Sequence, residues 1–370
     1  MTGRWAWAEI DLGAIAHNIG VVRAAAAPSA VWAVVKANGY GHGAVPVARA
    51  ASGAGATGLC VALAQEGSEL RAAGIEGRII VLSEQPPDLL PSIVRDRLEL
   101  TVYSAGQLRA LAAAGAVDHP VHLKIDTGMH RVGARPADAV ALAQEIDDCP
   151  ATRLAGVLTH FAVADEPDDP YTATQWAVFE RVLDEVGRAG IVVEEVHAAN
   201  SAGALAHPVA RASFVRAGIA VYGLSPGPGV DHLAAELRPA MSLRARVSFV
   251  KRVPAGAGIS YGLRHRLAQD STIATLPLGY ADGVPRRLHS CGGEVLVGGK
   301  RRPIVGVITM DQLMVDCGDD DIAVGDEAVL IGEQGSERIT ADDWAAQLGT
   351  IGYEIVCGIS ARIERRYLGQ

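Results

Sequence analysis

The chain has 370 residues, of which 49% are hydrophobic and 20% are charged, and its formal net charge is −9. This composition indicates a globular protein that is long enough for two domains. The acidic balance argues against a nucleic-acid surface, which needs a basic face. No apolar run approaches the roughly 20 residues of a membrane helix, and the N-terminus lacks a signal-peptide core. Five cysteines are scattered without a CxxC pair, so we expect reduced thiols and a cytoplasmic protein.

Strand-like and helical patterns alternate through the first part of the chain. Eight short β-branched runs lie at residues 31–36, 58–63, 78–83, 98–103, 121–126, 154–161, 193–200 and 213–223. Alanine-rich stretches separate most of them, and residues 171–188 show apolar side chains at three- and four-residue steps, as one face of a helix does. The alternation predicts a (β/α)8 barrel, and the nearly continuous apolar runs suit strands buried on both faces. An open doubly wound sheet is the alternative.

The pattern changes near residue 235, where helical periodicity gives way to short strands separated by glycine. Only one helix is predicted there, over residues 340–348. Thr340 is its expected N-cap, and Asp343 three residues later approximates a capping box. We therefore expect a barrel domain over residues 1–235 and a mostly antiparallel β domain over residues 236–370.

Polar residues stand where the predicted barrel strands end, at the face that holds the sites of such barrels. Lys36 ends the first strand. The polar residues near the ends of later strands are Asp126, Arg131, His160, Asn200, Ser201 and Arg216, the last of these with Gly218. A lysine at a strand end is ordinarily a surface residue. If partly desolvated, however, it would have a lowered pKa and could form a Schiff base.

The histidines do not predict a metal site. Most have no partner at metal-ligand spacing, and His119 and His122 lack a third ligand nearby. The acidic run at residues 318–321 lacks the twelve-residue pattern of a calcium loop. We assign no metal.

Nine motifs resemble, in order, those of the alanine racemase family. They are AVVKANGYGHG, KIDTGMHRVG, THFAVAD, HAANSAG, VRAGIAVYG, GISYG, LGYADG, MDQ and IGYEIVCGISARIERRY. The resemblance runs from Trp7 almost to the C-terminus. It implies a racemase that depends on pyridoxal 5′-phosphate (PLP), pairs a barrel with a β domain, interconverts L- and D-alanine, and supplies D-alanine for cell-wall peptidoglycan.

The resemblance assigns the two proton-transfer roles to Lys36 and Tyr261. Racemisation removes the α-proton and returns one to the opposite face, which requires the amine to be tied to PLP, because the PLP ring delocalises the carbanion. Lys36 would hold PLP as an imine and then act as base on one face, and Tyr261 would act on the other. A phenol has an ordinary pKa of about 10. Tyr261 therefore needs nearby positive charge, for which Arg131 and His160 are the candidates.

The same resemblance gives the remaining roles. Arg216 faces the pyridine nitrogen, where it donates a hydrogen bond but does not leave that nitrogen fully protonated. Arg131 and the backbone N–H of Met310 bind the substrate carboxylate, and Lys124 looks like the family lysine that can be carbamylated and orients the arginine. The other residues are Tyr40, His160, Asn200, Ser201, Gly218, Ile219 and Tyr353 for the cofactor, with Asp311 and Tyr280 in support.

Tyr261 and Met310 fall in the β domain, whereas Lys36 falls in the barrel. In the resembled family the β domain of the partner chain completes each site, so the resemblance implies a homodimer with two shared sites. Two positions depart from the family pattern, which commonly has glycine where His130 stands and often arginine where Val307 stands. These departures bear on substrate rates and on the entry channel.

Other functions remain open at this stage. Broad-specificity racemases of serine or basic amino acids share these motifs. A PLP-dependent decarboxylase would be expected to place an acidic residue at the pyridine nitrogen, and Arg216 argues against it. A non-catalytic PLP-binding barrel needs neither the β domain nor Tyr261. A PLP-free lyase with a lysine Schiff base would leave Arg216 without a purpose.

Overall fold

The computed structural model describes residues 4–369, which separate into two compact units. One unit is Ala14–Arg238, and the other joins the segment that ends at Gly13 to the chain from Pro239 onward. The sequence suggests that the first 235 residues form one domain. In the structure the N-terminal strand β1 (Ala6–Asp11) instead belongs to the sheet of the C-terminal unit, because its hydrogen-bond partners lie there.

The first unit is built on eight parallel strands. They are β2 (Ala30–Val34), β3 (Gly58–Val61), β4 (Arg78–Val81), β5 (Glu99–Val102), β6 (His119–Lys124), β7 (Thr152–Leu158), β8 (Glu195–His197) and β9 (Phe214–Ala217). Their order in the sheet is β8-β7-β6-β5-β4-β3-β2-β9. The two ends of this sheet meet, because the N–H of Ser213 donates to the carbonyl of Val196 at 2.9 Å and the N–H of Arg216 to that of Ala199 at 2.9 Å. The predicted barrel is confirmed, and the open sheet is wrong.

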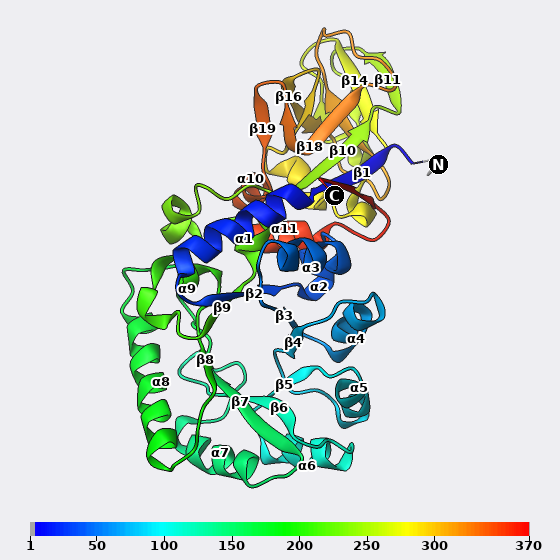
Figure 1. Ribbon diagram of the computed structural model, residues 1–370. Coiled ribbons are helices and arrows are strands. Elements are labelled where there is room, and N and C mark those ends of the chain that lie inside the picture. The colour runs from blue at the N-terminus through cyan, green and yellow to red at the C-terminus, as the bar shows by residue number, and fades with distance from the viewer. Residues whose placement is uncertain (1–3, 370) are drawn as a thin grey trace. The chain divides into compact units, whose positions relative to one another are not determined.

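One helix, α1, precedes the first barrel strand, and helices follow most of the strands. They are α1 (Leu12–Ala26), α3 (Ala44–Gly53), α4 (Ala64–Ala72), α5 (Leu90–Arg95), α6 (Ala105–Ala113), α7 (Ala139–Asp147), α8 (Tyr171–Arg188) and α9 (Ser201–Ala206). Figure 1 shows α4 to α8 on the outside of the barrel strands. Helix α8 has the predicted bounds, and it buries Phe179, Val182 and Val186, which lie on one helical face.

The barrel interior is filled by side chains. The rings of Trp32 and Phe214 stack with centroids 4.3 Å apart, and both are buried. Gly58 makes room for them, because a Cβ at that position would overlap the Trp32 ring. The glycine that begins β3 is thus explained by the close approach of an aromatic side chain.

The second unit is mostly antiparallel. Besides β1, its strands are β10 (Met241–Arg246), β11 (Phe249–Val253), β12 (Gly258–Ile259), β13 (His265–Arg266), β14 (Ser271–Leu276), β15 (Glu294–Val297), β16 (Lys300–Val305), β17 (Leu313–Asp316), β18 (Glu327–Gln334), β19 (Glu337–Ile339) and β20 (Glu364–Leu368). The main sheet runs β11-β14-β17-β16-β15-β18-β10-β1-β20. Only the pairing of β1 with β20 is parallel among the described strands of this unit. The expected β fold is confirmed.

Two α-helices lie in the second unit as far as the structure describes it. Helix α10 (Ala341–Leu348) has the predicted capping box, in which Asp343 N–H donates to Thr340 Oγ1 at 3.0 Å and Thr340 N–H to Asp343 Oδ2 at 2.7 Å. Helix α11 (Gly352–Gly358) was not expected, so the prediction of a single helix is wrong. It makes only about two turns, too few to establish a period. Among the described residues, no helix combines the length and apolar character that spanning a membrane requires.

Candidate functional site

Lys36 lies two residues after the end of the first barrel strand, with Val35 between them, and begins a tight turn, α2 (Lys36–Tyr40). The backbone of this turn is left-handed over four consecutive residues, with φ of 52°, 53°, 59° and 50° from Ala37 to Tyr40. Only one of the four is glycine. A left-handed conformation costs other residues about 1–2 kcal/mol each. Such strain persists where the surroundings enforce it, and it clusters at functional sites.

Glu66 is one of the groups that hold this turn. Its Oε1 accepts the N–H of Ala37 at 2.6 Å, and its Oε2 accepts those of Ala62 at 2.8 Å and Leu63 at 3.1 Å. The carboxylate therefore ties the turn after Lys36 to the start of α4. Sequence reasoning missed Glu66. The only signal was an incomplete capping box, since Leu63 stands where serine or threonine is expected.

The turn directs Tyr40 toward Gly218. A Cβ at Gly218 would lie 2.7 Å from the Tyr40 hydroxyl, so only glycine permits this approach. The Tyr40 ring packs on Tyr222 with centroids 4.8 Å apart, and the Tyr222 hydroxyl donates to the carbonyl of Val34 at 2.9 Å. Tyr222 is therefore a core aromatic that positions Tyr40.

Ser201 lies beside the same glycine. Its Oγ accepts the N–H groups of Gly218 at 2.8 Å and Ala220 at 3.3 Å, which leaves its own hydrogen for donation. Gly218 and Ile219 are both expected to bind the cofactor, but the N–H of Gly218 is used inside the protein, whereas the Ile219 N–H makes no hydrogen bond to any described residue. Asn200 caps α9, and its side chain accepts the Gly203 N–H at 2.9 Å.

Arg216 is buried, with 3% of its surface exposed. Its Nη2 donates to the carbonyls of Thr159 at 2.8 Å and Ala198 at 2.9 Å and contacts His160 Nδ1 at 3.1 Å, while Nη1 donates to His197 Nδ1 at 2.8 Å. No hydrogen bond links Nε to a described residue. Burial lowers the pKa of Arg216 to about 10, which still leaves the guanidinium protonated at neutral pH.

His160 does not supply positive charge. Burial and the neighbouring Arg216 lower its pKa well below its usual value, so the imidazole is neutral at neutral pH. The expectation that His160 could stabilise a tyrosinate is therefore wrong. Arg131, whose side chain is exposed, remains as the candidate for that role.

Lys124 ends β6 and is 6% exposed. Burial first, and then the charges of Arg216 and Arg131, lower its pKa to about 8. A substantial fraction of this amine is consequently neutral near physiological pH, and a neutral amine is the form that attacks carbon dioxide.

His130 has a left-handed backbone, with φ of 55°. Its N–H donates to Asp126 Oδ1 at 2.9 Å, and its Nδ1 lies 3.4 Å from Asp126 Oδ2. The position therefore has the conformation that glycine adopts at no steric cost. This explains the glycine of the family pattern, and Asp126 stabilises the histidine found here.

In the second unit, Tyr261, Tyr280 and Met310 lie on loops that contact one another. The N–H of Tyr280 donates to the carbonyl of Thr309 at 3.0 Å, and that of Ala281 to Met310 at 3.1 Å. Ser260, which precedes Tyr261, donates through its hydroxyl to the carbonyl of Val307 at 2.7 Å. A groove of about 720 Å³ adjoins these loops, and its lining includes Phe249, Ser260, Tyr261, Thr309 and Gln312.

Arg362 joins two of these loops. Its Nη2 donates to Asp311 Oδ1 at 2.6 Å, and its Nε lies 3.3 Å from Oδ1 of the buried Asp282. Sequence reasoning missed Arg362, because it stands among other arginines in SARIERR with nothing to distinguish it. Tyr353 lies on α11 and is half-buried.

The predicted residues therefore form two sets, one in each unit. The barrel gathers Lys36, Tyr40, Lys124, Arg131, His160, Ser201, Arg216 and Gly218 near the carboxyl ends of its strands. The second unit gathers Tyr261, Tyr280, Met310 and Asp311 on adjoining loops. Within residues 4–369, no group of three or more histidine, cysteine or acidic side chains could hold a metal ion.

Comparison with known proteins covers both units. The family model described as alanine racemase, N-terminal domain, matches residues 10–226, and the one described as alanine racemase, C-terminal domain, matches residues 240–367. The alanine racemase of Symbiobacterium thermophilum is 47% identical over 368 residues, which span 98% of this chain and 97% of that relative. The alanine racemase of Thermobifida fusca is 44% identical over 371 residues, or 99% of this chain and 98% of that relative.

Solved structures give the same result. The alanine racemase of Streptomyces lavendulae matches with a TM-score of 0.93 and 42% identity, over 100% of this chain and 98% of that one. The alanine racemase of Bacillus anthracis, solved with bound L-Ala-P, matches with a TM-score of 0.94 and 39% identity, over 100% of this chain and 96% of that one. The chain belongs to the alanine racemase family.

Proposed function

We propose that this protein interconverts L-alanine and D-alanine with PLP as its cofactor. The observation that carries the proposal is the donor set of the barrel. Lys36 begins the turn after β2, the buried Arg216 keeps Nε–H without a partner among the described residues, and small donors surround Gly218. Membership of the family supports the same reaction.

The barrel residues fit PLP chemically. The hydroxyls of Tyr40 and Ser201 and the N–H of Ile219 suit a phosphate, because Gly218 brings no side chain between them. Arg216 suits the ring nitrogen, where it donates without releasing its proton. When bound, PLP supplies the electron sink that makes the α-proton acidic.

The protein's own residues then bind the substrate and move the proton. Lys36 Nζ holds the cofactor and moves a proton on one face of the substrate, and Tyr261 Oη moves one on the other. Arg131 and the Met310 N–H bind the carboxylate, and the charge of Arg131 favours the ionised phenol of Tyr261. Because Arg216 keeps its own proton, the ring nitrogen gains no full charge, which favours proton return over decarboxylation.

Lys124 is proposed to carry a carbamate that orients Arg131. Its lowered pKa supports this, since the neutral amine reacts with carbon dioxide. Protein prepared with ¹³C-bicarbonate is expected to show a carbamate carbon signal that the Lys124→Met variant lacks. Absence of the signal in the unsubstituted protein would leave Lys124 as a plain amine.

The site is proposed to be shared within a homodimer, with the β unit contributed by the partner chain. Large apolar side chains are exposed on that unit, with exposed fractions of 74% for Tyr261 and 54% for both Phe249 and Leu263. Exposed apolar patches of this kind mark interaction surfaces. A cytoplasmic location, the supply of D-alanine for peptidoglycan, and a division into barrel and β domains near residue 235 complete the proposal.

The test combines spectroscopy with isotope exchange. The purified protein should show a PLP absorption band that Lys36→Ala abolishes, and it should convert L-alanine in deuterated water into D-alanine deuterated at Cα. Tyr261→Phe should lose racemisation yet still exchange the α-proton of one enantiomer, while Tyr367→Phe, outside the site, should behave as the unsubstituted protein. Faster turnover of serine or lysine than of alanine would favour the broad-specificity reading. A protein that binds PLP but exchanges no α-proton would contradict catalysis.

A further inference from the structure

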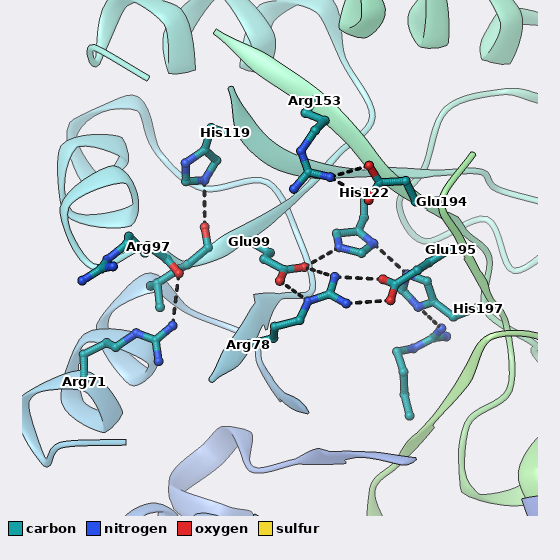
Figure 2. A network of polar contacts seen from close by, with 12 residues as sticks. Arg71, Arg78, Arg97, Glu99, His119, His122, Arg153, Glu194, Glu195 and His197 are labelled. Carbon is teal, nitrogen blue, oxygen red and sulfur yellow. Dashed lines mark hydrogen bonds and ion pairs between the residues drawn. The ribbon is translucent and has the colours of Figure 1, made fainter. Parts of the chain in front are cut away.

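Charged side chains lie at the end of the barrel where its strands begin, and their exposed fractions range from 7% in Glu99 to 40% in Arg78. Arg78 on β4 and Glu195 on β8 come from strands that are not neighbours in the sheet. Arg78 Nη1 nevertheless bonds Glu195 Oε1 at 2.6 Å, so this contact crosses the barrel. Arg78 also bonds Glu99 on β5, through Nε at 2.5 Å and Nη2 at 2.8 Å. Figure 2 shows Arg78 between the two carboxylates.

A chain of hydrogen bonds links Glu99 to Arg216. Arg216 Nη1 lies 2.8 Å from His197 Nδ1, His197 Nε2 lies 3.1 Å from His122 Nδ1, and His122 Nε2 lies 2.7 Å from Glu99 Oε2. Both histidines are fully buried. The part of this chain from His197 to Glu99 is drawn with dashed lines in Figure 2.

Geometry fixes the direction of this chain. A guanidinium only donates, so His197 Nδ1 must accept and its proton must be on Nε2. His197 then donates to His122 Nδ1, which places the proton of His122 on Nε2, facing the carboxylate of Glu99. Every donor therefore points from Arg216 toward Glu99. We call Arg216, His197, His122 and Glu99 the relay.

Gly156 on β7 gives the relay its space. A Cβ at this position would lie 2.5 Å from His122 Nδ1, which is inside the distance that side-chain carbons tolerate. The glycine stands among apolar residues in the second half of the strand, and nothing in its own backbone conformation requires it. The barrel is thus built to hold the His122 ring.

The relay also connects a positive charge at one end with an excess negative charge at the other. Among the described residues Arg216 has no carboxylate partner, and its acceptors are carbonyls and imidazoles. An uncompensated buried charge is costly. At the other end, Arg78 lies between two carboxylates and leaves one negative charge in excess. Burial raises the pKa of Glu99, but the hydrogen bonds from His122 and Arg78 outweigh burial and lower it.

We propose that Glu99 and His122 are positioning residues for Arg216. Acting through His197, they fix the direction of the Arg216 guanidinium, and the carboxylate of Glu99 balances its charge from the far end of the barrel. The proposal rests on the proposed function, in which Arg216 meets the ring nitrogen of PLP. With Nη1 and Nη2 fixed by protein acceptors, Nε–H is the donor left for that nitrogen. No proton moves along the relay during the reaction.

Glu99→Gln and Glu195→Gln form a matched pair for the test. Each removes one negative charge from beside Arg78, but only Glu99 contacts an imidazole of the relay. If the two carboxylates only stabilise the barrel, both variants should lose PLP affinity to the same extent. A role in positioning Arg216 would affect Glu99→Gln far more.

The first readout is ¹⁵N NMR of protein labelled in its histidine side chains, recorded with and without PLP. In the unsubstituted protein His122 and His197 should both be neutral, with the proton on Nε2. Glu99→Gln should change both signals, whereas Glu195→Gln should leave them in place. The second readout is PLP affinity, which should fall about tenfold or more in Glu99→Gln, equivalent to about 1.4 kcal/mol, and remain within about twofold in Glu195→Gln.

Two results would overturn the proposal. One is a proton on Nδ1 of either histidine in the unsubstituted protein, a result that needs no variant to fold. The other is equal loss of PLP affinity in both variants, which would reduce Glu99 to a partner of Arg78. These readouts do not depend on turnover. Failure to racemise alanine would contradict the proposed function but would not contradict the positioning role of Glu99 and His122.

Discussion

The hydroxyl of Tyr40 lies so close to Gly218 that a Cβ there would be 2.7 Å from it. Gly218→Ala must therefore displace the phenol, together with one of the donors proposed for the cofactor phosphate. We expect PLP affinity to fall about tenfold or more, equivalent to about 1.4 kcal/mol, as measured by equilibrium dialysis of cofactor-free protein. Gly187→Ala is the control, because nothing lies within 4 Å of its added Cβ. Equal affinity in the two variants would mean that Tyr40 does not contact the phosphate.

Gly58→Ala should destabilise the barrel. The added Cβ would overlap the buried Trp32 ring, which is stacked on Phe214 and cannot move without disturbing it. Overpacking of this kind costs about 1–3 kcal/mol. Thermal unfolding followed by circular dichroism should show a lower transition temperature than in the unsubstituted protein, whereas Gly187→Ala, on helix α8 with open space at its Cβ, should not lower it. An unchanged temperature would mean that the interior is loosely packed around Trp32.

Lys124 should make the free energy of unfolding increase with pH in the alkaline range. Its pKa is about 8 in the folded protein and 10.5 ordinarily, so between these values the unfolded chain holds more protons. Stability therefore rises as the pH increases from about 8 toward 10.5. Below pH 8 both states are protonated, and the cost of the buried charge is fully present. Each pKa unit by which the folded and unfolded states differ changes the free energy of unfolding by about 1.4 kcal/mol.

Lys124→Met should remove the free-energy cost of burying the charged amine. In buffer freed of carbon dioxide, we expect denaturant unfolding to show the variant most stabilised relative to the unsubstituted protein below pH 8. The advantage should shrink as the pH rises toward 10.5. A stability difference that does not change with pH would contradict the lowered pKa.

The sequence predicted the barrel well because buried parallel strands and amphipathic helices leave local signals. The bounds of α8 and the capping box at Thr340 are examples, each encoded within a few consecutive residues. Strand β1 shows the limit. A run of six residues can indicate a strand, but its sheet depends on partners that are more than 200 positions away.

Some site residues could be predicted from the sequence and others could not, again because only local patterns are visible in it. Residues at strand ends, such as Lys36 and Arg216, could be placed because the barrel brings strand ends together. His122 could not, since the sequence pairs it with His119, whereas residues three apart on a strand face opposite sides. The structure instead joins His119 to the Leu98 carbonyl and His122 to Glu99. Contacts between distant strands carry no local signature.

Glu66 should control the turn after Lys36. Both of its oxygens accept backbone N–H groups, including that of Ala37 in the left-handed turn. In Glu66→Gln the amide nitrogen must face at least one of these donors, which leaves a backbone N–H without an acceptor at a cost of about 1–3 kcal/mol. Because the turn is strained, we expect this loss to release it and to misplace Lys36. The variant should therefore lose turnover number more than substrate affinity and load PLP more slowly. Glu69→Gln lies on the same helix, α4, at an exposed position, and it should match the unsubstituted protein in both respects. If the two variants behave alike, the strained turn is held by its other contacts, such as the one from Asn38 Oδ1 to the N–H of Ala44 at 3.0 Å.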